Sequence, residues 1–335
     1  MTLADSLLAE PGATASFTAD VLEPPAPAAA RLSQALAASF GNACAAIIHY
    51  GSHAQRSGAK AESAFDFFVI VSDYDAAYTA LAASRGTKLK PSTAARLNRL
   101  LAPNVIAIRF PEFTPPALAK CAVLSQDDLA LATSAQAPDH FTQGRLFQHV
   151  QLAWTATDAQ RHSVLAALAA CRARTCDWGL PFLSAGFDAA GFIRALLARS
   201  FEAEIRPETA DRIDTLTGAQ RDSLAPVYDE LLQRLEHRKI IKKTGAVYHL
   251  VAPVPARERR HWDRYFRRSK RRATMRWGKY VLLYDDWLEY VVQKVARRSG
   301  TTVELTSRER RWPLIFLWPR VFRYLRSRPQ RRRST

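Results

Sequence analysis

Gly51, Ser52 and Asp66 stand at the ends of two neighbouring apolar runs, and their chemical types suit a site for phosphate and metal. The run at residues 45–50 stops at Gly51-Ser52, and the run at residues 66–71 opens with the single carboxylate of Asp66. Glycine lets the backbone approach a phosphate closely, and Ser52 offers a hydroxyl and an amide at a predicted helix start. A carboxylate on the neighbouring strand can hold Mg²⁺ against the same phosphates. The pattern predicts a strand, a phosphate loop and a second strand.

This arrangement is typical of nucleotidyltransferases. Most of them carry Asp-x-Asp or Asp-x-Glu on the second strand, where this chain has Asp66-Phe67-Phe68. Each residue also has a purely structural interpretation, because a Gly-Ser pair can be an ordinary strand-to-helix turn and Asp66 can cap the start of its strand. These residues alone leave both interpretations open.

Positive charge is concentrated in the last quarter of the chain. The 335 residues carry a net charge of +17, and their 48% hydrophobic content is that of a globular protein. Residues 257–335 hold 24 Lys and Arg against 7 Asp and Glu, whereas residues 1–256 hold 24 of each kind. Aromatic residues alternate with the cations at 259–268 and 311–320. Composition leaves three possibilities open: an anionic membrane surface, a nucleic acid, or a solvated tail with no partner.

Several classes of protein are disfavoured by the remaining composition. The cysteines show no zinc-ligand spacing and are expected to be reduced, structural thiols; they are Cys44, Cys121, Cys171 and Cys176. The segment 1–17 has no secretory signal pattern, and no apolar run approaches the roughly 20 residues of a membrane span. We therefore expect a protein that is cytoplasmic or bound peripherally to the inner face of a membrane.

Hydrophobic periodicity and breaker residues predict an α/β (α+β) fold, with a mixed sheet followed by a helical domain. Residues 1–30 are an Ala/Pro-rich leader, and residues 251–335 form the basic, aromatic tail. The predicted sheet domain, 31–157, contains strands at 45–50, 66–71, 105–110 and 120–124 and helices at 31–40, 74–83 and 125–132. The predicted helical domain, 158–250, contains helices at 160–174, 189–201, 209–216 and 226–238.

Five segments, in order, extend the first pattern. They are Tyr50-Gly51-Ser52; Asp66-Phe67-Phe68-Val69-Ile70-Val71; Lys120-Cys121-Ala122-Val123-Leu124-Ser125 with Asp128-Leu129; Gly144-Arg145-Leu146 with His149-Val150; and Glu202-Ala203-Glu204-Ile205-Arg206. Together they resemble the mitochondrial-type phosphatidate cytidylyltransferases, also called the translocator assembly and maintenance family, which has bacterial members. The chain departs from that family at Cys121-Ala122, Gln148-His149 and Glu204, where the family usually has Tyr-Gly, Lys-Pro and Asp.

The resemblance implies a reaction in which CTP and phosphatidic acid give CDP-diacylglycerol and pyrophosphate with Mg²⁺. It also implies a nucleotidyltransferase-like sheet domain, a helical domain, and a C-terminal segment that docks on the membrane. The expected partners are CTP, phosphatidic acid and an anionic membrane surface contacted through residues 257–335, with no stable nucleic-acid partner. Two alternatives stay open: a protein of this fold that acts on a nucleic acid or another polar acceptor, and a catalytically inactive binding module.

The resemblance also assigns roles to individual residues. Tyr50, Gly51 and Ser52 would bind the nucleotide. Asp66 and Glu204 would hold Mg²⁺, and they form the catalytic set together with Lys120. Lys120 and Arg145 would neutralise the triphosphate, and Arg145 and Arg206 would bind the lipid headgroup. The structural alternatives are an ion pair between Glu204 and Arg206, and surface or ion-paired positions for the other cations.

Overall fold

The computed structural model describes residues 2–59, 63–87, 89–183, 186–204, 209–283 and 306–308. Residues up to Leu283 form one compact unit, and residues from Tyr284 onward form a second. Two parts of the sequence predictions lie outside the described residues: Arg206, and nearly all of the basic tail beyond residue 283, including the stretch 311–320.

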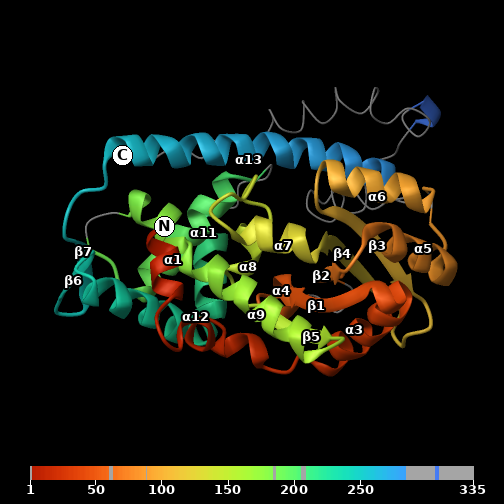
Figure 1. The fold of residues 1–335 in the computed structure, drawn as a ribbon, viewed down its shortest axis with the longest axis horizontal. Helices are drawn as coiled ribbons and strands as arrows, with labels where there is room; N and C mark the ends of the chain where they lie inside the picture. The colour runs from red at the N-terminus through yellow and green to blue at the C-terminus, as the bar shows by residue number, and fades with distance from the viewer. Residues whose placement is uncertain are drawn as a thin grey trace. The chain divides into compact units, whose positions relative to one another are not determined.

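A five-stranded mixed sheet lies at one end of the first unit (Figure 1). Its order is β3-β4-β2-β1-β5, in which β2 and β4 run parallel and the other neighbours run antiparallel. The strands are β1 (Cys44–Tyr50), β2 (Phe65–Val71), β3 (Asn104–Phe110), β4 (Ala117–Ser125) and β5 (Gln151–Thr155). The predicted strands and the mixed α/β class are confirmed.

Helices cover both faces of this sheet, so its central strands are buried on both sides. β2 is buried without alternation from Phe67 to Val71, as expected for a strand between two layers. One face packs on α3 (Pro27–Phe40), which leads through η2 (Gly41–Ala43) into β1, and on α5 (Tyr74–Arg85) and α6 (Pro91–Leu100). The other face packs on the helical part of the protein, beginning with α7 (Gln126–Thr133), α8 (Gln143–Leu146) and α9 (Asp158–Ala173).

Short polar side chains start the helices that follow the central strands. Ser125 caps α7 by accepting a hydrogen bond from the Asp128 N–H at 3.1 Å. Asp73 caps α5 in the same way, because it accepts the Ala76 N–H at 2.8 Å. Asp75 lies in the first turn of α5 and pairs with Arg99 at 2.6 Å. The two acids that follow β2 therefore have structural partners of their own.

The first 30 residues, predicted as a leader, belong to the folded core. They contain α1 (Leu3–Leu8), α2 (Ala13–Phe17) and η1 (Ala19–Leu22), which pack on α9 and on α12 (Ala210–His237). Leu7, Phe17 and Val21 are fully buried there. The Asp20 carboxylate pairs with the buried Arg172 guanidinium and with His149 Nδ1 at 2.8 Å. Apolar burial and this ion pair together hold the segment against the helical part.

The sequence predicts a break between two helices that the structure does not have, and it predicts no strands in the helical part. That part consists of α9, α10 (Thr175–Gly179), η3 (Leu180–Phe182), α11 (Ala189–Glu202) and α12. Instead of helices at 209–216 and 226–238 there is one helix, α12, with Pro226 inside it. Proline has no N–H, so the carbonyl of Asp222 loses its helical partner, but both residues are exposed and water can replace the bond. The chain after α12 is a hairpin of β6 (Ile241–Thr244) and β7 (Val247–Leu250), which turns at Gly245 with φ +63°.

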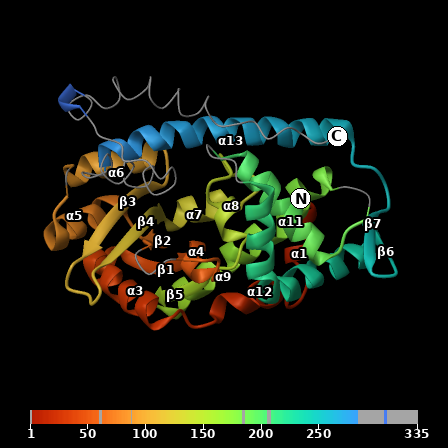
Figure 2. The ribbon, with the colours of Figure 1, turned by 180° about the vertical axis from the view of Figure 1, so that it is seen from behind.

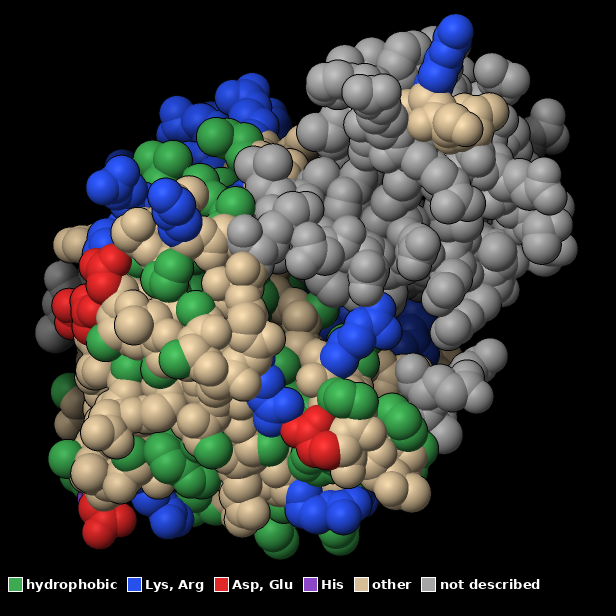
Figure 3. All heavy atoms as spheres, turned by 90° about the vertical axis from the view of Figure 1, so that its right-hand side faces the viewer, with side chains coloured by type: hydrophobic (Ala, Val, Ile, Leu, Met, Phe, Trp, Pro, Cys, Tyr) green, Lys and Arg blue, Asp and Glu red, His purple; other side chains and the backbone are tan. Residues whose placement is uncertain are grey.

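The basic segment that starts at residue 257 forms the long helix α13 (Ala256–Leu283). Figures 1 and 2 both show it running along one side of the unit from the β6–β7 hairpin to α6. Tyr265, Phe266, Ser269 and Arg276 are buried on its inner face. Its exposed cations are Arg257, Arg259, Arg260, Arg264, Arg267, Arg268, Lys270 and Arg271. In Figure 3, Lys and Arg side chains gather at the upper edge of the described surface, the side along which α13 runs in Figure 1.

None of the helices in the described ranges is long and apolar enough to cross a lipid bilayer. The four cysteines are free and buried, as predicted.

Candidate active site on the sheet

Three of the predicted site residues lie side by side across three neighbouring strands. Tyr50 at the end of β1 is opposite Asp66 in β2, and Asp66 is opposite Lys120 in β4. Side chains alternate between the two faces of a sheet. Phe68 lies two residues beyond Asp66 and is buried towards the helical part, so Asp66 and its two neighbours project from that same face. The pleat of the sheet therefore gathers a phenol, a carboxylate and an ammonium group in one row.

Gly51 brings the backbone into contact with the Asp66 carboxylate. It has φ +79°, and a Cβ atom placed on it would lie 2.6 Å from Asp66 Oδ2. Glycine is the residue that tolerates both this conformation and this contact. Ser52 follows in the first turn of the short helix α4 (Gly51–Ala54). The turn after β1 and the carboxylate at the start of β2 therefore lie against each other.

Arg145 of α8 joins this row from the helical side. Its Nη1 lies 2.8 Å from Oε1 of Glu204, just after the end of α11, and both side chains are partly exposed. Burial alone lowers the pKa of Arg145, but the nearby carboxylates of Glu204 and Asp66 more than offset it, so the pKa is raised. Burial raises the pKa of Tyr50, and the Asp66 carboxylate raises it further. The site therefore holds a charged guanidinium that pairs with Glu204 and interacts electrostatically with Asp66.

The structure brings the predicted residues together from five separate parts of the chain. Those in the cluster are Tyr50, Gly51, Ser52, Asp66, Lys120, Arg145 and Glu204. Arg206, the predicted second headgroup cation and alternative partner of Glu204, lies outside the described residues. In the described part of the chain, Glu204 pairs with Arg145.

The donor set suits a magnesium ion that keeps most of its ligands from substrate and water. Mg²⁺ is usually bound by one or two carboxylates together with substrate phosphates and waters. Asp66 and Glu204 supply two carboxylates, and both interact electrostatically with Arg145. Within the residues that the structure describes, no group of three or more His, Cys, Asp or Glu side chains is placed to hold a metal ion.

Comparison with known proteins does not assign the chain to a family. No protein-family model matches the chain, and no curated protein matches it. The family resemblance of the five segments stays a prediction.

Sequence reasoning missed the aromatic residue beneath the site cation. The Arg145 guanidinium lies over the Phe141 ring, 3.8 Å from its centroid, and Nη1 donates to the Phe141 carbonyl at 2.7 Å. The guanidinium of Arg276, from α13, lies over the same ring at 4.6 Å. Phe141 precedes the Gly144-Arg145-Leu146 segment and could have been noticed as its neighbour. Arg276 is one cation among many in α13, and nothing in its sequence surroundings distinguishes it.

Gln148 and His149, which depart from the family pattern, are buried in a polar network behind the site. Gln55 Nε2 donates to Gln148 Oε1 at 3.0 Å, and Gln148 Nε2 donates to the Gly144 carbonyl at 2.7 Å. The His149 N–H donates to Gln220 Oε1 at 2.9 Å, while its ring contacts Asp20. These residues join α4, α8 and α12, so they support the site from behind.

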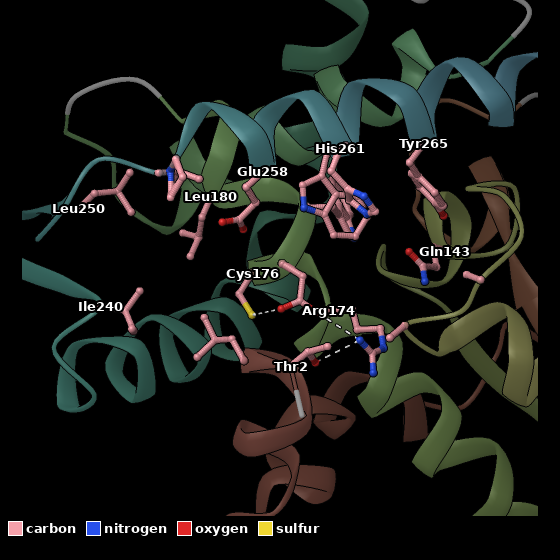
Figure 4. Close-up of a pocket in the computed structure, with 18 of the residues that line it drawn as sticks. Thr2, Gln143, Arg174, Cys176, Leu180, Ile240, Leu250, Glu258, His261 and Tyr265 are labelled. Carbon is pink, nitrogen blue, oxygen red and sulfur yellow. Dashed lines mark hydrogen bonds and ion pairs between the residues drawn. The ribbon is translucent and has the colours of Figure 1, made fainter.

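A separate cleft of about 1120 Å³ opens between the N-terminus, the β6–β7 hairpin and the first turns of α13. Figure 4 shows His261 and Tyr265 projecting into it from α13, opposite Thr2 and Arg174, which are joined by a hydrogen bond of 3.3 Å. Gln143 of α8 also lines it. None of the predicted site residues in the described chain lines this cleft.

Proposed function

We propose that this protein is a Mg²⁺-dependent nucleotidyltransferase of the phosphatidate cytidylyltransferase type, which makes CDP-diacylglycerol and pyrophosphate from CTP and phosphatidic acid at a membrane surface. The observation that carries the proposal is the convergence of Asp66, Lys120, Arg145 and Glu204 beside the glycine turn at Gly51. Carboxylates for a metal, cations for phosphates and a close-approach turn are the parts that nucleotidyl transfer requires.

In the proposed reaction, a phosphate oxygen of the lipid attacks the α-phosphorus of the nucleotide. A new P–O bond forms, the bond from the α-phosphorus to the bridging β-phosphate oxygen breaks, and pyrophosphate leaves with that electron pair. The lipid phosphate is already ionised at neutral pH, so the chain needs no general base. Lys120 and Arg145 neutralise the triphosphate and the approaching phosphate, and the Gly51-Ser52 backbone holds the phosphates in line.

Asp66 and Glu204 are the residues that would hold Mg²⁺. The bound ion supplies charge neutralisation on the triphosphate oxygens. Glu204 also keeps Arg145 within the site through their 2.8 Å ion pair. The guanidinium is thereby held close to the phosphates that it must neutralise.

The test is pyrophosphate release from CTP in mixed micelles that contain phosphatidic acid and Mg²⁺. We expect turnover that requires all three components and falls by about 10²–10³-fold or more in Asp66→Ala, the loss typical of removing a group that stabilises the transition state. Asp222→Ala is the matched control, because it removes an exposed carboxylate from α12. Turnover by Asp66→Ala at the wild-type rate, or turnover that ignores phosphatidic acid, would contradict the proposal.

A second candidate is transfer of a nucleotide to a nucleic acid. The exposed Arg and Lys side chains of α13 favour it, since the same cations bind nucleic-acid phosphates. It shares the sheet site with the first candidate and differs in the acceptor. Replacement of phosphatidic acid by RNA or DNA in the same assay distinguishes the two.

A further inference from the structure

Three side chains of α13 fasten the segment that leads into α8. Ser269 Oγ accepts a hydrogen bond from the His140 backbone N–H at 3.0 Å. Arg272 Nε and Arg276 Nη2 both donate to Asp139 Oδ2, at 2.7 and 2.8 Å. Residues three and four positions apart share one face of a helix. The inner face of α13 therefore binds this segment through side chains on consecutive turns.

Phe141 connects these contacts with α13 to the proposed site. Its N–H donates to the other oxygen of Asp139 at 3.0 Å, so the carboxylate held by α13 also fixes the Phe141 backbone. Its ring carries the guanidinium of Arg276 at 4.6 Å and that of Arg145 at 3.8 Å. Its carbonyl accepts from Arg145 Nη1 at 2.7 Å. One residue thus contacts both the site cation and the inner face of α13.

Arg276 is poorly explained as a contribution to stability alone. It is 3% exposed, and Nη2 donates both to Asp139 and to the Ala102 carbonyl, the latter at 2.6 Å. Its Nε and Nη1 atoms have no hydrogen-bond partner in the described part of the chain. Burial of a guanidinium with unsatisfied donors is unfavourable, and apolar residues often fill such positions with a gain in stability. The planar guanidinium of Arg276 instead makes a cation–π contact with the face of the Phe141 ring.

We propose that Phe141 and Arg276 are positioning residues for Arg145. The Phe141 ring and the two guanidinium groups that lie over it form a stack. Through this stack α13 influences the nucleotide site even when no membrane is bound. The inference rests on the proposed function. The ring restricts where the Arg145 guanidinium can lie, and the carbonyl of the same residue sets its rotation. The Arg276 guanidinium lies over the same ring and holds it in place for Arg145.

The experiment measures CTP affinity of the full chain by isothermal titration calorimetry, with Mg²⁺ and no lipid. Phe141→Leu removes the aromatic face, and we expect it to weaken CTP binding about five- to tenfold, the size of losing an oriented cation–ring contact. Phe141→Tyr restores the face and should bind CTP like the wild type. Arg276→Lys keeps the charge but lacks the planar group, so it should also weaken binding. Arg271→Lys is the same substitution on the exposed face of α13 and should leave affinity unchanged.

Each outcome is decisive for one of the two proposals. Wild-type affinity in both Phe141→Leu and Arg276→Lys, with Arg145→Ala impaired, would overturn the positioning role and leave the proposed function standing. Absence of CTP binding by the wild type would overturn the proposed function and this inference with it. Where Phe141→Leu is poorly folded by circular dichroism, the combination of Arg145→Lys and Arg276→Lys replaces it. If the fold-losses of CTP affinity in the two single variants multiply to give that of the combination, the two residues act independently, which contradicts the stack.

Discussion

Gly51 marks the position at which a single methyl group would disturb the whole site. Alanine there takes on the strain of φ +79° and also collides with Asp66 Oδ2 at 2.6 Å. Gly58 is a matched control, because it has φ +80° and nothing within 4 Å of a Cβ atom.

We therefore expect Gly58→Ala to lower the free energy of unfolding by about 1–2 kcal/mol, which is the strain alone. Gly51→Ala should lower it further and abolish pyrophosphate release by displacing the Asp66 carboxylate. Urea unfolding and the pyrophosphate assay check the pair. Equal effects of the two substitutions on both measurements would show that the contact with Asp66 is unimportant.

His140 makes stability depend on pH. Its ring is buried between Trp178 and the aromatic residues of α13, and Nε2 bonds Ser200 Oγ at 2.8 Å. Burial lowers the pKa of His140 to about 3. An unfolded histidine has a pKa of about 6.5. Between these values the unfolded state binds a proton that the folded state does not, so stability falls as the pH falls.

We expect the contribution of His140 to be fully present above pH 6.5 and to decline by up to about 1.4 kcal/mol per pH unit below it. Urea unfolding of the wild type and of His140→Gln between pH 4.5 and 7.5 measures this slope, which should be shallower in the variant. His162→Gln, at an exposed site on α9, is the control. Parallel pH profiles for the wild type and His140→Gln would contradict the prediction.

Among the elements, the N-terminal helices depend on one buried ion pair. The side chains of Asp20 and Arg172 are 4% and 0% exposed. Burial alone raises the pKa of Asp20, but Arg172 and the hydrogen bond from His149 outweigh it, so the pKa is lowered. Asp20→Asn leaves Arg172 buried without its counter-charge, and we expect it to lower the free energy of unfolding by about 3–5 kcal/mol. Asp222→Asn, exposed on α12, should change it by less than about 0.5 kcal/mol. Thermal or urea unfolding compares the two, and equal stabilities would rule out this role for the pair.

Local patterns were enough to predict four of the five strands of the sheet and the residues that they carry, but not β5 or the β6–β7 hairpin. Residues 44–50 and 65–71 are apolar runs bounded by turn residues, and the placement of Asp66 followed from its position at the start of a run. The two ends of α12 were predicted as separate helices because Pro226 is a local breaker whose cost depends on exposure, which sequence does not reveal. The role of residues 1–30 depends on contacts with α9 and α12, more than a hundred residues away.

The same distinction separates the two halves of the candidate site. Tyr50, Gly51 and Asp66 are close in sequence and come together through one strand pair. Arg145 and Glu204 were suggested only by the family resemblance, because their pairing joins α8 to the end of α11. The role of Arg276 could not be predicted, because it depends on contact with the Phe141 ring, 135 positions earlier in the chain.

At the scale of the whole molecule, the exposed face of α13 is expected to control binding to anionic surfaces. Each cation near anionic lipid contributes roughly 1 kcal/mol, so the double substitution Arg267→Glu/Arg271→Glu should weaken vesicle binding at least about tenfold. Arg96→Glu/Arg161→Glu makes the same change in net charge at exposed positions on α6 and α9 and serves as the control. Sedimentation with anionic and neutral vesicles measures the difference, which added salt should reduce.

RNA filter binding by the same proteins tests the alternative that α13 binds a nucleic acid. Strong RNA binding together with equal vesicle binding by all of the variants would contradict a lipid-docking role for α13.

The packing of α1 and α2 on α9 has a consequence for how the protein is made. Ribosomes add roughly 5–20 residues per second, and α9 ends at Ala173, about 165 residues after the end of α1 at Leu8. For about 8–30 seconds the nascent chain therefore displays Leu7 and Phe17 with no surface to cover them. These helices are synthesised well before the helix that covers them, and during that interval they are natural targets for a chaperone at the ribosomal exit.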